Sequence, residues 1–160
     1  MYSYLNPDSL FVFGNLYSDT VVIYSGKNIC PDGWRVPTYL DWQTLFAFAG
    51  GPDWVATSLP LSRKIIEPRR EVLSGIWNWS SIQNVTSITN ETGFSARASG
   101  STFYNPYMMA WNMPLTGASA EFWVWEPLPQ CVKIDGETGN VNFYDEPPSG
   151  IAFAIRCVKN

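Results

Sequence analysis

Apolar and polar residues alternate most regularly near the end of the chain. The runs 131–135 and 140–144 each alternate, and Gly136-Glu137-Thr138-Gly139 separates them. A period of two indicates strands, and a short glycine-containing connection between two such runs predicts a β-hairpin. The alternation puts Val132, Ile134, Val141 and Phe143 on the expected core face. The expected outer face, polar and aromatic, carries Lys133, Asp135, Asn142 and Tyr144.

A helix is predicted directly after Pro37. Thr38 and Asp41 have the spacing of a capping box, and Gly50-Gly51 ends the apolar pattern. Within that span Leu40, Leu45 and Phe48 recur near helical spacing. A second, short helix is expected over residues 60–67, because Pro68 would terminate it.

Shorter apolar runs predict further strands. These runs are 11–13, 20–24 and 122–125, and glycines and polar residues separate the first two. Residues 78–93 are rich in Ser, Thr and Asn, which at this length predicts an ordered surface loop.

Length and composition bound the class of protein. The 160 residues fit one domain, residues 1–160, and 46% of them are hydrophobic and 16% aromatic, with eight Trp and eight Tyr. We expect Trp34, Trp42 and Trp123 in the core, whereas Trp111 and Trp125 are equally compatible with core and surface. Some aromatic residues should be exposed for recognition, because Tyr and Trp offer large contact areas.

Charge and hydropathy exclude two classes of partner. The net charge of −4 argues against nucleic acid, whose binding depends on Lys and Arg. No window has the length and apolarity of a transmembrane helix, so we expect no membrane insertion. The N-terminal residues 1–7 lack the pattern of a signal peptide.

The three cysteines allow one bridge. We expect Cys30 to pair with Cys157, which would close the chain on itself and leave Cys131 free. The alternatives are a Cys131–Cys157 bridge and three reduced thiols.

Five blocks in order resemble a known family. The blocks are Phe13-Gly14-Asn15-Leu16-Tyr17, residues 29–38 with Trp42, Asn90-Glu91-Thr92-Gly93-Phe94-Ser95-Ala96, Phe122-Trp123, and residues 152–159. They resemble the Fibrobacter succinogenes major paralogous domain, a module of secreted and surface proteins of Bacteroidetes and related bacteria. Residues 105–130 depart most from the family pattern, which fits a ligand-specific surface.

The resemblance implies an α+β, C-type-lectin-like fold. Such a fold has small twisted antiparallel sheets, about two helices, long irregular loops and neighbouring termini. Its loops and adjacent strand face would bind ligand. We therefore expect ligand contacts from three regions: the long loop with Tyr107, Trp111 and Asn112, the residues beside the strand, Trp125, Glu126 and Gln130, and the outer hairpin face with Lys133, Asn142, Tyr144 and Asp145. The resemblance and the cysteines also imply an extracellular or cell-surface location.

The lectins of this fold that bind calcium share a Glu-Pro-Asn or Gln-Pro-Asp tripeptide. Here the corresponding tripeptides are Glu67-Pro68-Arg69, Glu126-Pro127-Leu128 and Glu146-Pro147-Pro148, and none supplies the third oxygen ligand. We expect no bound metal and no cofactor. The chain also has no histidine, which removes imidazole-dependent triads and the common iron and zinc sites.

The sequence therefore favours a non-enzymatic binding module, of adhesin type, for a glycan or a surface protein. A hypervariable binder diversified by a retroelement is a refinement of that hypothesis. The alternatives are a structural domain of a pilus or other surface assembly, and a relative of the formylglycine-generating oxidases.

Overall fold

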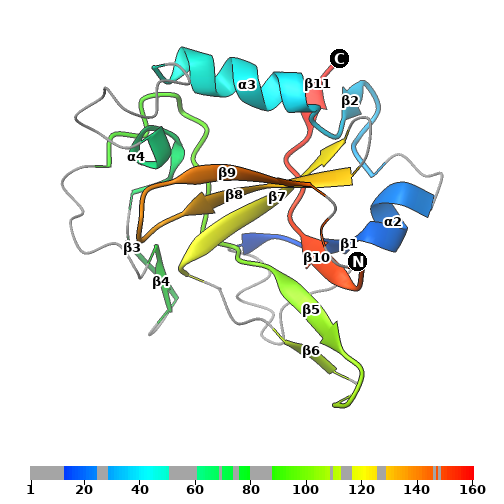
Figure 1. Ribbon diagram of the computed structural model, residues 1–160. Helices are drawn as coiled ribbons and strands as arrows, with labels where there is room; N and C mark the ends of the chain where they lie inside the picture. The colour runs from blue at the N-terminus through cyan, green and yellow to red at the C-terminus, as the bar shows by residue number, and fades with distance from the viewer. Residues whose placement is uncertain are drawn as a thin grey trace.

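The computed structural model describes most of the chain. The described residues are 13–24, 29–50, 61–68, 70–73, 76–79, 88–108, 110–112, 117–125, 129–145, 147 and 149–160. The helices are α2 (Asp19–Tyr24), α3 (Tyr39–Phe48) and α4 (Leu61–Ile65). The strands are β1 (Tyr17–Ser18), β2 (Trp34–Arg35), β3 (Arg70–Leu73), β4 (Ile76–Asn78), β5 (Thr102–Asn105), β6 (Ala110–Asn112), β7 (Ser119–Trp125), β8 (Pro129–Asp135), β9 (Val141–Asp145), β10 (Ile151–Phe153) and β11 (Val158–Lys159). The architecture is mixed α+β, with small antiparallel sheets (Figure 1).

A three-stranded antiparallel sheet, β7-β8-β9, forms the centre of the molecule. Its register aligns Phe122 with Val132 and Val132 with Phe143. This confirms the predicted hairpin and extends the strand predicted at 122–125. A four-stranded sheet has the order β1-β10-β5-β6, and the pairs β11-β2 and β3-β4 form two-stranded sheets.

The central sheet is covered on both faces. Helix α3 crosses one face (Figure 1), where Trp42 packs on Phe122 with ring centroids 5.5 Å apart. The main core beneath the helix includes Val132, Ile134 and Val141, and Phe143 packs against it, as the alternation predicted. A second cluster on the opposite face is formed by Trp123, Cys131 and Phe153. Part of the expected outer face is therefore interior.

The capping of α3 is as predicted, but its buried face is not. The Asp41 N–H donates to the Thr38 hydroxyl and the Thr38 N–H donates to the Asp41 carboxylate. The buried side chains are Trp42 and Phe46, whereas Leu40 is 68% and Phe48 76% exposed. Apolar residues occur on all sides of this segment, so spacing alone could not select the face. The short helix expected over 60–67 is confirmed as α4.

Three further expectations are wrong. Residues 20–24 belong to helix α2 rather than a strand. The Asp19 carboxylate accepts the Thr20 N–H at 2.7 Å, so local hydrogen bonding at the helix start outweighs the β-propensity of the valines. Trp34 is exposed rather than buried, because its two-residue strand β2 pairs only with β11. The strand predicted at 11–13 is wrong at Phe13, which is helical and buried in the main core, and the rest lies outside the described residues.

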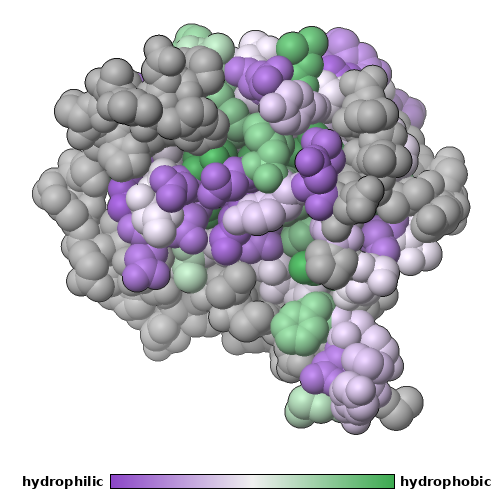
Figure 2. All heavy atoms as spheres, viewed as in Figure 1, coloured by the Kyte–Doolittle hydropathy of each residue, from purple (hydrophilic) through white to green (hydrophobic). Residues whose placement is uncertain are grey.

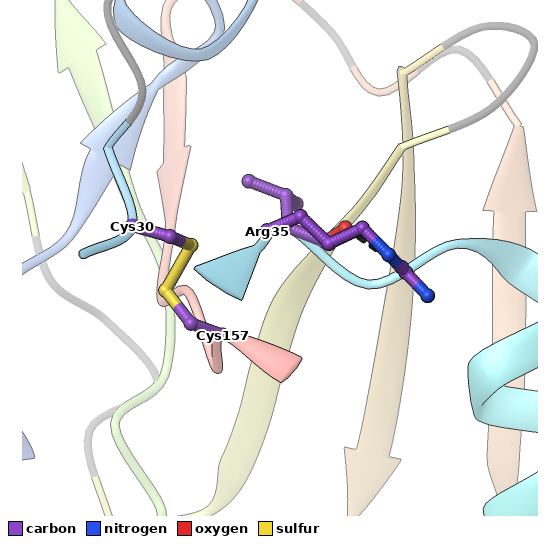
Figure 3. Close-up of a disulfide and its surroundings, with 4 residues drawn as sticks. Cys30, Arg35 and Cys157 are labelled. Carbon is purple, nitrogen blue, oxygen red and sulfur yellow. Dashed lines mark hydrogen bonds between the residues drawn. A yellow bond between two sulfur atoms is a disulfide. The ribbon is translucent and has the colours of Figure 1, made fainter. Parts of the chain in front are cut away.

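The disulfide joins Cys30 to Cys157, as expected, with their Cα atoms 5.8 Å apart and 127 residues of separation. Figure 3 shows the bridge beside Arg35, whose side chain extends away from it. Strands β2 and β11 pair next to the bridge, with Arg35 opposite Val158. Cys131 is free and buried, so the Cys131–Cys157 alternative is wrong.

Candidate functional site

Three of the expected ligand residues lie on the outer face of the central sheet. Lys133 and Asn142 are direct partners across β8 and β9, and Tyr144 lies in the next row, opposite Cys131. Directly paired residues point to the same side of a sheet, so these three side chains share a face. Trp125, a fourth expected ligand residue, lies on the same face of β7, one row beyond Trp123. The alternation predicted the placement of the three hairpin residues.

Only part of this face is accessible. Trp123 and Cys131 are buried under Phe153, while Tyr144 is 48% and Trp125 40% exposed. The Lys133 ammonium lies 4.0 Å from both the Glu121 and the Asp135 carboxylates. Its charge is therefore largely balanced within the protein, and Trp125, Asn142 and Tyr144 are left as the free contact groups.

Gln130 and Asp145 form a separate pair. The Gln130 amide donates to the Asp145 carboxylate at 2.7 Å, and the two residues are register partners at the end of the hairpin. Alternation places them on the side of Val132 and Phe143, not on the outer face where Asp145 was expected. Asp145 directly follows the outward-facing Tyr144, so in an alternating strand its side chain lies on the opposite face of the sheet.

The turn of the β8–β9 hairpin is held by Asp135. Burial alone would raise the pKa of this carboxyl, but hydrogen bonds from Thr138 and the charge of Lys133 bring the pKa below its usual value. The Asp135 carboxylate accepts the backbone N–H groups of Glu137 and Thr138 at 3.0 and 2.8 Å. Its role is therefore to order the turn that joins the two strands.

The remaining expected residues lie on a second hairpin or outside the described residues. Strands β5 and β6 form a hairpin that projects from the body (Figure 1). Tyr107 lies in the turn between the two strands. Trp111 and Asn112 belong to β6, where they pair with Tyr104 and Phe103. Glu126 lies outside the described residues. The expected surface is thus divided between the central sheet and this projecting hairpin.

The tip of the β5–β6 hairpin presents its side chains to solvent. Tyr107 is 96% exposed, and Phe103, Tyr104 and Met108 are further large side chains of the hairpin that are exposed. Figure 2 shows hydrophobic and weakly polar residues gathered on this projection. The Asn105 carboxamide oxygen accepts the N–H groups of Tyr107 and Met108 at 3.0 and 3.2 Å, which orders the turn. The sequence analysis missed Phe103, Tyr104 and Met108, although the aromatic run around Asn105-Pro106 was a visible signal.

Within the described residues, no three acidic, cysteine or histidine side chains gather in a way that could hold a metal ion. The expected absence of calcium stays a prediction. In the same part of the chain no helix has both the length and the apolarity needed to cross a membrane.

The sequence of residues 2–159 matches the family model of the Fibrobacter succinogenes major domain. The chain belongs to this family. The match confirms the resemblance drawn from the five sequence blocks. No curated protein and no solved structure matches the chain. The C-type-lectin-like arrangement expected from the family therefore stays a prediction, while the α+β class with small antiparallel sheets is confirmed.

Proposed function

We propose that this Fibrobacter succinogenes major domain is a C-type-lectin-like, non-enzymatic binding module of adhesin type that recognises a surface glycan or protein. The observation that carries the proposal is the projecting β5–β6 hairpin, whose tip holds the 96% exposed Tyr107. Large aromatic side chains left in water contribute little to folding. They are enriched where binding energy concentrates, because they bring much contact area at a small cost in conformational entropy.

The hairpin is built to present these side chains in a fixed geometry. Asn105 orders the turn through two backbone N–H groups, and β5 is anchored in the sheet by its pairing with β10. A preordered contact loses less entropy on binding than a mobile one. The outer sheet face would add Trp125, Asn142 and Tyr144 as a second contact area.

The proposed extracytoplasmic location rests on the Cys30–Cys157 bridge and on the family. Disulfides persist in oxidising compartments and are rare in reducing ones. The proposal of a non-enzymatic role rests on the sequence, which has no histidine.

A structural role in a surface assembly is the second candidate, and one observation favours it. The solvent side of α3 carries Leu40, Thr44 and Phe48 at intervals of four residues and no charged side chain. An uncharged helix face with two large exposed apolar residues is typical of a contact between subunits. In this case the domain would self-associate through α3.

Binding of the purified domain to a panel of immobilised glycans and bacterial or host surface proteins tests the proposal. Each measurement is made with calcium and with chelator. A hit that chelator does not weaken agrees with a binding module that needs no calcium. A blank panel together with concentration-dependent self-association in light scattering would instead favour the assembly role.

A further inference from the structure

A cavity of about 510 Å³ lies away from both proposed contact areas. Its walls come from four of the five sequence blocks that identify the family, which converge from distant parts of the chain. Phe13 and Tyr17 come from the first block, Ser95 from the Asn90–Ala96 loop, and Arg156 from the last block. The volume is in the range of pockets that hold small organic ligands, roughly 300–1,000 Å³.

The charged groups of the cavity are cationic. Arg97 and Arg156 line it, and none of the lining residues is acidic. The Arg97 guanidinium is already paired, because its Nε lies 3.0 Å from a Glu67 carboxylate oxygen. The cavity therefore keeps about one uncompensated positive charge, that of Arg156, in a protein whose net charge is −4. Arg156 is exposed to solvent, and a retained cation on the wall of a concave site favours an anionic ligand.

Arg156 is held in position without being neutralised. Its guanidinium carbon lies 5.1 Å from the centroid of the Phe94 ring, and its Nη2 donates to the Phe94 carbonyl at 3.0 Å. No carboxylate among the described residues forms an ion pair with it. A planar guanidinium fixed on an aromatic ring, with further N–H groups to donate, suits a carboxylate.

The rest of the wall suits a hydroxylated ring. Tyr17, which is half-buried, supplies aromatic surface on which the C–H face of a sugar can stack, whereas the lining residues Phe13 and Phe122 are only 7% and 6% exposed. The Asn15 carboxamide also lines the cavity, and its Oδ1 is buried without a hydrogen-bond partner among the described residues. A buried acceptor without a partner is costly, and a ligand hydroxyl is a donor toward which this amide can reorient.

The Ser95 part of the wall is held in a strained conformation. Ser95 has a φ of 56°, in the left-handed region that non-glycine residues seldom adopt. The Asn90 side chain holds it there, accepting the Ser95 N–H at 3.0 Å and donating to the Ser95 hydroxyl at 2.8 Å. Such strain is often found where a binding wall must be shaped. The two hydrogen bonds of the Asn90 side chain give Asn90 and Ser95 a shared role in shaping this loop.

We propose that this cavity binds a carboxylate-bearing saccharide unit, of the uronic acid class, with Arg156 holding the carboxylate. Tyr17 and Asn15 would hold the ring and its hydroxyl groups. The site is separate from the β5–β6 hairpin, so it would add a small-ligand specificity to whatever the hairpin recognises.

Binding of D-glucuronate to the full chain, followed by backbone chemical shifts and calorimetry, tests the proposal. D-glucose serves as the neutral analogue and N-acetylglycylglycine as a peptide carboxylate. We expect both probes to bind at least about tenfold more weakly than glucuronate. Arg156→Gln should weaken glucuronate binding by about tenfold, and Arg156→Lys should weaken it less. Lys159→Gln is the matched control, because it removes the same charge three residues away, outside the cavity wall.

Three results would overturn the inference. One is the absence of shifts around the cavity at about 10 mM glucuronate, a weak affinity even for a monosaccharide. Another is equal binding of glucose or of the peptide carboxylate. The third is equal effects of Arg156→Gln and Lys159→Gln in variants that keep the wild-type melting temperature. Tyr107→Ala should leave glucuronate binding unchanged, so failure of the hairpin proposal and failure of this one are distinguishable.

Discussion

The indole Nε1 of Trp123 donates a 2.7 Å hydrogen bond to the backbone carbonyl of Tyr17. The bond joins strand β7 of the central sheet to β1, the edge strand of the four-stranded sheet, and its two residues lie 106 positions apart along the chain. Trp123 is fully buried, and its ring packs against Phe153 with centroids 4.8 Å apart. This contact fastens the four-stranded sheet, and hence the projecting hairpin, to the central sheet.

Trp123→Phe should therefore destabilise the fold by about 1–3 kcal/mol, because it removes the donor and leaves the Tyr17 carbonyl without it. Trp125→Phe is the matched control on the same strand and face, where the side chain is exposed. It should change stability by less than about 0.5 kcal/mol. Urea unfolding of both variants measures the difference. Equal losses would mean that the hydrogen bond contributes nothing.

The start of α3 should depend on pH. Hydrogen bonds from the Arg35 guanidinium, followed by those from Thr38, hold the pKa of Asp41 well below the usual carboxyl range. Because the folded pKa is lower than the unfolded one, the stabilisation is complete above the ordinary carboxyl pKa. It is lost as the pH falls toward the folded pKa.

We expect Asp41→Asn to cost about 1–2 kcal/mol near neutral pH, from the lost cap and a partly exposed ion pair. The difference from wild type should shrink as the pH is lowered below the ordinary carboxyl pKa. Asp32→Asn, which removes an exposed carboxylate shortly before the helix, is the control. A pH-independent difference between wild type and Asp41→Asn would contradict the assigned role.

Loss of the disulfide should have a large effect. The bridge closes a segment with a sequence separation of 127 residues, for which the chain-entropy relation gives about 4–5 kcal/mol. The Cys30→Ser/Cys157→Ser double variant should unfold at a much lower urea concentration. Peptide mapping without reductant should recover the linked Cys30 and Cys157 peptides, and a linked Cys131 peptide would refute the pairing.

The free thiol should be unreactive in the folded protein. Burial, followed by the nearby Glu121 charge, raises the pKa of Cys131 well above its ordinary value. Thiolate is the reactive form, so a disulfide reagent at about pH 8 should label Cys131 only after unfolding. Because the folded pKa is raised, the neutral thiol favours folding below the ordinary thiol pKa, and this contribution declines at more alkaline pH. Rapid labelling of the native protein would show that the second cluster opens.

The parts of the fold that could be predicted from the sequence are those that depend on residue spacing and alternation within a short segment. The Thr38–Asp41 cap, the β8–β9 hairpin and its two faces follow from spacing and alternation, and the family resemblance follows from the five blocks. Tertiary packing decided the rest. Alternation assigned Lys133 and Tyr144 to an outer face, but it could not show that Phe153 covers the Trp123 and Cys131 part of that face.

The candidate site was less predictable than the fold. Tyr107 was expected as part of the long loop that the family resemblance assigns to ligand binding. Its position at a projecting tip depends on the pairing of β5 with β10, which is distant in sequence. The cavity was not predicted, because Phe13, Ser95 and Arg156 meet only in the folded chain. Their membership of three matching blocks was a signal that they converge, but it did not indicate a cavity.

The most direct test of the central claim compares two pairs of exposed apolar residues on the binding panel. Tyr107→Ser/Met108→Ser changes the hairpin tip, and Leu40→Ser/Phe48→Ser changes the solvent side of α3. All four side chains are exposed, so both double variants should keep the wild-type melting temperature within a few degrees. The account predicts that the hairpin variant loses panel binding while the α3 variant retains it. Retained binding by the hairpin variant, or its loss in the α3 variant alone, would contradict recognition through the β5–β6 hairpin.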